Sequence, residues 1–249
     1  MKKFLTFGTI VVSLLSFNNI VNAEESTNDI HTTYEQKEIT NEEILLERAQ
    51  NNISDISEKE EEKILPINDA TIVNEETGEE ENTETYVTTQ KVQETQTDDG
   101  SQTDSYVTTV FATAAVSGDA SRSDYANDAS ISVKASSTFY WDKSTVRGVP
   151  VYKHKGAKGS WKISDSNITI SNRSYTLNNA GMNPDKGLVS ESKRYELSSN
   201  SFSKAAPSTF STIIASKAKS WVFGVTMDCK VKEVSSGDTW NFHFVNKIK

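Results

Sequence analysis

The chain has 249 residues and a formal net charge of -9, from 26 Lys and Arg against 35 Asp and Glu. A single Cys excludes an intramolecular disulfide framework and a multi-cysteine zinc site. Three His leave little for metal or triad chemistry, and the acidic total excludes a uniformly basic nucleic-acid-binding protein.

The N-terminus has the pattern of a secretory signal peptide over residues 1–23. Lys2 and Lys3 precede an apolar run over residues 4–17, and Val21-Asn22-Ala23 places small residues where a signal peptidase requires them. The run has about 14 residues, fewer than the roughly 20 that cross a bilayer. We expect cleavage after Ala23, and a product that is secreted, carries no transmembrane anchor and is soluble or held non-covalently at a surface.

Residues 24–105 form an acidic, Thr- and Glu-rich segment with a net charge of -19. Aromatic residues are nearly absent from it, so the segment on its own buries too little apolar surface to offset the entropy of ordering. We therefore predict that it is largely disordered. One short helix is predicted over residues 42–50, with Thr40 and Glu43 as a capping box.

Residues 106–249 form a basic domain with a net charge of +8, ordered from about residue 128. Between Trp221 and Val231 apolar side chains alternate with polar ones, and a turn sequence leads to a second alternating run at Trp240 to Phe244, so a β-hairpin is predicted. Further strands are predicted at 131–141, 149–155, 160–163, 168–171 and 175–177, with loops at 155–159 and 178–181 and an irregular stretch at 197–207. The predicted fold class is mainly β: an antiparallel β-sandwich of immunoglobulin-like architecture.

No catalytic constellation is present in the sequence. Cys229 lies on the apolar side of its predicted strand, and alternation places His243 on the opposite side, which disfavours a Cys–His dyad. The motifs of serine hydrolases and phosphate-binding loops are absent. We expect a protein that is not an enzyme and that needs no metal or cofactor.

One stretch of the basic half combines cationic and aromatic side chains. This candidate ligand-binding site comprises Tyr152, Lys153, His154, Lys155, Lys158, Trp161 and Lys162. Such residues suit an anionic polymer, through point charges and stacking. The alternative is a solvated strand with Trp161 packed inward, whose lysines prevent aggregation at a sheet edge.

Three functions remain open. The first is a binding protein for an anionic cell-envelope polymer or another surface protein, rather than for nucleic acid. The second is a proprotein whose acidic segment shields a toxin-like or membrane-active β domain until it is removed. The third is a hydrolase on a β scaffold. The order of signal peptide, acidic stretch and Ser/Thr/Asn/Lys-rich β domain resembles secreted modules of Gram-positive bacterial surfaces. The oligomeric state stays open.

Overall fold

The computed structural model describes residues 29–56, 66–114, 133–214 and 221–248. The predicted signal peptide at 1–23, with its cleavage after Ala23, lies outside the described residues, as do residues 24–28 and 57–65 of the acidic segment. The described part of the chain contains one helix and a series of strands: β1 (Ile30–Glu35), α1 (Glu42–Gln50), β2 (Pro66–Asn74), β3 (Glu80–Asn82), β4 (Thr85–Thr97), β5 (Gln102–Ala114), β6 (Val133–Val146), β7 (Val149–Ile163), β8 (Ile168–Asn183), β9 (Gly187–Glu196), β10 (Ser201–Ala205), β11 (Ile213–Ile214), β12 (Val222–Glu233) and β13 (Thr239–Ile248).

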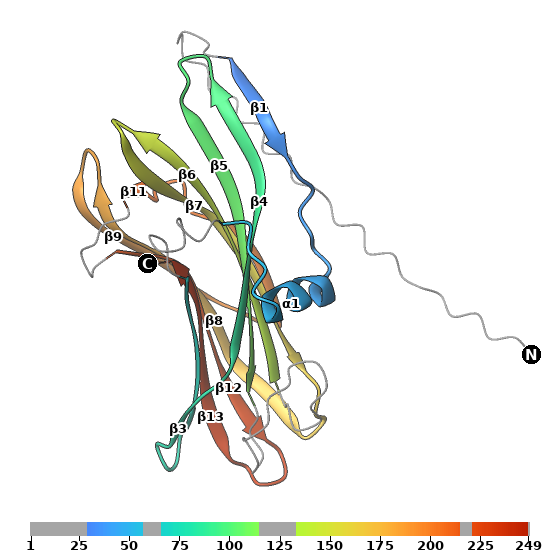
Figure 1. The fold of residues 1–249 in the computed structure, drawn as a ribbon. Coiled ribbons are helices and arrows are strands. Elements are labelled where there is room, and N and C mark those ends of the chain that lie inside the picture. The colour runs from blue at the N-terminus through green and yellow to red at the C-terminus, as the bar shows by residue number, and fades with distance from the viewer. Residues whose placement is uncertain (1–28, 57–65, 115–132, 215–220, 249) are drawn as a thin grey trace, which may run out of the picture.

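All these strands pair antiparallel within a single curled sheet (Figure 1). Its order is β1-β4-β5-β6-β7-β11-β8-β12-β13-β2-β3, with β10 added to β7 and β9 to β8. The prediction of a mainly β, antiparallel fold is confirmed. The finer prediction of an immunoglobulin-like sandwich is met only in part, because one continuous sheet supplies both packed layers.

The core lies inside the curl, where β12 and β13 face β5 and β6. Phe223 of β12 packs edge-to-face on Phe139 of β6, with ring centroids 4.9 Å apart. Asn246 of β13 is 1% exposed, and its Nδ2 donates to the Ser137 carbonyl oxygen at 3.0 Å. Apolar burial and a buried polar bond thus both join the two layers.

The hairpin predicted around residues 221–244 is confirmed. Strands β12 and β13 pair from Phe223 with Ile248 to Lys232 with Thr239. The side chains expected to face inward from the first run are all buried: Trp221, Phe223, Val225, Met227, Cys229 and Val231. The period-2 pattern therefore identified both the element and its inner face.

Two predicted loops are instead parts of long strands. The glycine-containing stretch 155–159 lies inside β7, and residues 178–181 lie inside β8. Gly159 is required by close packing, since a Cβ there would lie 2.7 Å from Phe202 Cε1 and 2.9 Å from the Ser136 carbonyl oxygen. Residues 201–205 of the stretch predicted to be irregular form β10, which pairs with β7 beside these glycines.

The prediction of disorder is corrected for residues 29–56 and 66–105, where the acidic segment forms β1, α1, β2, β3, β4 and the start of β5. The boundary placed between residues 105 and 106 falls inside β5. The helix at 42–50 is confirmed, but its N-cap is Asn41 rather than Thr40, since Asn41 Oδ1 accepts from the Glu43 and Ile44 amides at 2.9 and 3.1 Å.

Candidate functional site

The outer face of β5, β6 and β7 carries hydroxyl and lysine side chains beside the apolar Phe111. Thr109 and Thr138 contact each other at 3.1 Å between hydroxyl oxygens, and Ser136 contacts Ser160 at the same distance. Side chains that pair across strands project to the same face. We call this surface the lysine face; it comprises Thr109, Ser136, Thr138, Lys158, Ser160 and Lys162.

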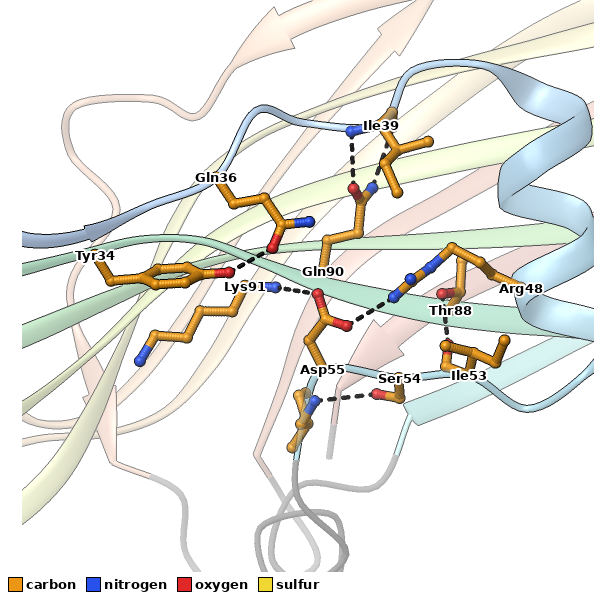
Figure 2. Close-up of polar contacts among 11 residues, drawn as sticks. Tyr34, Gln36, Ile39, Arg48, Ile53, Ser54, Asp55, Thr88, Gln90 and Lys91 are labelled. Carbon is orange, nitrogen blue, oxygen red and sulfur yellow. Dashed lines mark hydrogen bonds and ion pairs between the residues drawn. The ribbon is translucent and has the colours of Figure 1, made fainter.

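A segment from the acidic half lies across this face. Residues 30–56, the covering segment, pair as β1 with the edge of β4, reach the lysines of β7 at Glu38 and Glu42, and then pack as α1 on β4 and β5. Figure 2 shows how the segment is fixed on β4. The Ile39 amide donates to Gln90 Oε1 at 2.8 Å, and Gln90 Nε2 donates to the Ile39 carbonyl at 3.2 Å. Gln90 therefore serves the backbone of the covering segment as a neighbouring strand would.

Asp55 attaches the C-terminal end of the covering segment to β4. Its carboxylate accepts from Arg48 Nη2 at 2.7 Å and from the Lys91 amide at 3.2 Å (Figure 2). The Asp55 amide donates to the Thr89 carbonyl at 2.9 Å, and the Thr88 hydroxyl donates to the Ile53 carbonyl at 2.8 Å. The loop after α1 is thus attached to the backbone of β4.

The apolar contact beneath the helix is small. Leu45 and Ala49 of α1 are buried against Phe111 of β5, with Ile39, Leu46 and Tyr86 partly buried around them. This cluster is separate from the main core. Buried apolar area is the main source of stability, and here that area is small. Polar contacts therefore hold much of the covering segment in place.

Two acidic residues of the covering segment bind the lysines of the face. Glu38 Oε1 accepts from Lys158 Nζ at 2.8 Å and from the Tyr140 hydroxyl at 3.0 Å, and Glu42 is ion-paired with Lys162. Burial lowers the pKa of Lys158, but its bonds to Glu38 and Tyr140 outweigh burial and raise the pKa above its ordinary value. Lys158 is therefore a permanent cation at neutral pH.

A cavity of about 320 Å³ lies where the start of α1 meets the strands. Hydroxyl-bearing residues from four strands and from the residues before α1 line it, including Thr40, Thr109 and Ser203, together with Lys158 and Phe202. The covering segment therefore leaves space beside the lysine face.

The predicted ligand-binding residues divide into two groups. The aromatic members do not face outward with the lysines, since Tyr152, His154 and Trp161 are each 2% exposed and lie in the core. A register shift near Tyr140 changes the parity of β7, so Tyr152, His154 and Trp161 all point inward despite their odd and even numbers.

The lysines lie on the outer side of β7. Lys155 is ion-paired with Asp142 at 3.0 Å, and Lys153 is exposed and opposite Asp142 in register. Lys158 and Lys162 contact the covering segment. The sequence did not indicate Glu38, Glu42 and Tyr140. Glu38 lies 120 positions from Lys158 and 102 from Tyr140, and Glu42 lies 120 positions from Lys162, so no local pattern connects them.

A second cleft, of about 290 Å³, is lined by His243 and Asp228, and His243 Nδ1 lies 2.6 Å from Asp228 Oδ1. Cys229 also lines it, but burial, together with the neighbouring Asp228 carboxylate, raises the pKa of this thiol to about 12, so the thiolate is scarce at neutral pH. Within the described ranges, no three His, Cys, Asp or Glu side chains are grouped to hold a metal ion.

Comparison with known proteins found no matching family model, no matching curated protein and no matching solved structure. In the part of the chain that the structure describes, no helix has the length and hydrophobicity needed to cross a membrane.

Proposed function

We propose that this protein is an exported, non-enzymatic binding protein for an anionic cell-envelope polymer, and that the lysine face is its binding surface. The observation that carries the proposal is the pairing of Lys158 and Lys162 with Glu38 and Glu42. The two carboxylates occupy the positions in which the phosphates or carboxylates of a polymer would bind. The covering segment is then an internal competitor.

The spacing of the cations favours a polymer over a single small anion. Lys158 and Lys162 lie four residues apart on β7, a separation of about 13 Å in an extended strand. Lys153 continues the row on the same face, because its partner Asp142 alternates with Tyr140 and Thr138 on β6. A chain of repeated anions can reach several such positions at once, and its binding should weaken as salt rises.

The contacts between the covering segment and the lysines of the face are weak enough for a polymer to replace them. Both ion pairs are partly exposed, and exposed pairs contribute only about 0.2–1 kcal/mol each. The apolar cluster under α1 has three buried members. A polymer can therefore displace the residues near Glu38, Glu42 and α1 with the loss of these contacts and of the Gln90 bonds to Ile39, while the pairing of β1 with β4 remains.

The test is a titration of the purified protein with a glycerol-phosphate polymer at a series of salt concentrations, with dextran as the neutral control. The Glu38→Gln, Glu42→Gln double variant should bind the polymer about three- to tenfold more tightly, because two competing ion pairs are lost. The Lys158→Gln, Lys162→Gln variant should bind more weakly and with less dependence on salt.

Glu75→Gln is the matched control. Glu75 is ion-paired with Lys230 at 2.7 Å on the β2–β12 side of the sheet, away from the lysine face, so this variant loses the same type of contact. Its polymer affinity should equal that of the parent protein. If the double variant also binds like the parent, the covering segment does not compete and the proposal is refuted.

The proprotein hypothesis uses the same contacts in a different way. Proteolytic removal of residues 24–56 would uncover the lysine face permanently, where a polymer would displace the covering segment reversibly. Mass spectrometry of the secreted protein separates the two, since the proprotein requires a mature product that lacks Glu38 and Glu42.

A further inference from the structure

Two hairpin ends lie side by side at the end of the sheet where the β6–β7 and β8–β9 turns are located (Figure 1). The first turn is Arg147-Gly148, both with positive φ, at 52° and 78°. The second contains Asp185, whose carboxylate is 3.4 Å from Arg147 Nη2. The ion pair joins the two turns, and we call them the paired tips.

Apolar side chains continue across the paired tips on one face of the sheet. Val146 pairs with Val149, and Ile214 links Val151 of β7 to Met182 of β8, which in turn pairs with Leu188. Because cross-strand partners project to the same side, and Val149 and Val151 alternate in the same strand, these side chains form one patch.

Four residues of the patch are exposed to solvent, whereas Val151, which links the two hairpins, is buried. The relative exposure is 38% for Val146, 40% for Val149, 42% for Met182 and 68% for Leu188. Scattered apolar residues on a surface are ordinary, but a contiguous set at the end of two hairpins marks an interaction surface.

Cations surround this patch. Arg147 and Lys186 lie in the two turns, and Lys153 follows Val149 and Val151 on the same face of β7. All three are exposed, and the carboxylates near them are Asp185 beside Arg147, Glu191 near Lys186 and Asp142 opposite Lys153. Apolar side chains next to exposed Lys and Arg match the interface of an anionic lipid bilayer, where acyl chains lie beneath negatively charged headgroups.

We infer that the paired tips dock the protein onto an anionic lipid surface. Val149 and Leu188 enter the headgroup region, and Arg147 and Lys186 contact lipid phosphates. A bilayer fits this end of the molecule because two narrow turns can enter the headgroup region without rearrangement of the sheet. Lys153 also continues the row of cations of the lysine face, but Val149, Leu188, Arg147 and Lys186 belong to the paired tips alone, so the inference can be tested on residues that the proposed function does not use.

The experiment is flotation of the full protein with vesicles of phosphatidylcholine, with and without phosphatidylglycerol. The protein should partition into vesicles that contain phosphatidylglycerol, and the Val149→Ser, Leu188→Ser double variant should partition at least about tenfold less. Val234→Ser is the matched control, because Val234 is 58% exposed and directly follows β12, whose end pairs with the start of β8, far along the strand from the β8–β9 turn. It should bind like the parent.

Three results would overturn the inference. The first is equal partition of the Val149→Ser, Leu188→Ser variant and the parent, and the second is equal partition of the parent into neutral and anionic vesicles. The third is a parent protein that binds no vesicles and forms a dimer, where the Val149→Ser, Leu188→Ser variant is a monomer. The last result would assign the patch to self-association. The Val149→Ser, Leu188→Ser variant should bind the glycerol-phosphate polymer with the affinity of the parent. Failure of this inference and failure of the proposed function are therefore distinguishable.

Discussion

Acidification should destabilise the fold through His154. The ring is 2% exposed, contacts the Gly224 carbonyl through Nε2 at 3.1 Å, and packs against Phe139 with centroids 4.7 Å apart. Burial among these groups lowers the pKa of His154 from 6.5 to about 4, although the Gly224 bond acts in the opposite direction. The neutral imidazole is therefore the form that the folded protein accepts.

The size of the effect follows from the pKa difference between the folded and unfolded states. The difference of about 2.5 pH units corresponds to about 3 kcal/mol, at about 1.4 kcal/mol per unit. Since the folded pKa is the lower one, the unfolded state binds more protons between pH 6.5 and about 4. Stability from this group is complete above pH 6.5, decreases as the pH falls through that window, and reaches its minimum below about 4.

Urea unfolding of the parent protein and of His154→Gln across this pH range is the assay. The variant is less stable overall because it loses ring packing, but its free energy of unfolding should fall by about 3 kcal/mol less on acidification. Hydrogen-bonded carboxylates such as Glu75 and Glu94, whose pKa values are lowered, affect both proteins equally. Parallel pH profiles for the two proteins would refute the reasoning.

Three further predictions concern packing. Leu45→Ala should lower the free energy of unfolding of α1 by about 2–3 kcal/mol, because it removes a buried contact with Phe111, and amide hydrogen exchange should show faster exchange in α1 alone; exchange at the parent rate would contradict this. Gly159→Ala should destabilise the whole protein by about 1–3 kcal/mol in thermal unfolding, since a Cβ would lie 2.7 Å from Phe202 Cε1, and an unchanged melting temperature would show that β10 can move away. Cys229 should react with a thiol reagent at pH 8 only after urea is added, because its pKa is raised to about 12; rapid labelling of the folded protein would disprove its burial.

Local sequence patterns were sufficient to predict those elements whose own residues show the alternation or capping that is typical of a strand or a helix. The β12–β13 hairpin alternates apolar and polar residues along both strands, and α1 begins with a capping residue and good helix formers. These signals depend on neighbours a few residues apart, so they survive without knowledge of the rest of the chain.

The acidic segment was misjudged because its stability is not local. Composition shows that the segment cannot form a core of its own. Here it needs none, because β4 pairs along its length with β5, and the apolar surface is supplied by β5 and residues beyond it. Polar strands such as β4 are stable at this position because their backbone bonds are completed by a strand that the sequence pattern does not identify as a partner.

The candidate site was only half predictable for the same reason. The lysines of β7 were visible as a cluster, whereas Glu38 and Tyr140 became partners of Lys158 only through folding. The inward direction of His154 depends on a register shift opposite Tyr140 and Trp141, and an irregularity of one residue reverses every face that follows it.

Competition between the covering segment and an anionic polymer is the central claim. Amide hydrogen exchange of the full protein, with and without the glycerol-phosphate polymer, tests it most directly. The polymer should accelerate exchange in α1 and at the Ile39 amide, which donates to Gln90, while exchange in β12 and β13 stays unchanged. Polymer binding with full protection retained in α1, or no polymer binding at low salt, would show that the covering segment and the polymer do not compete.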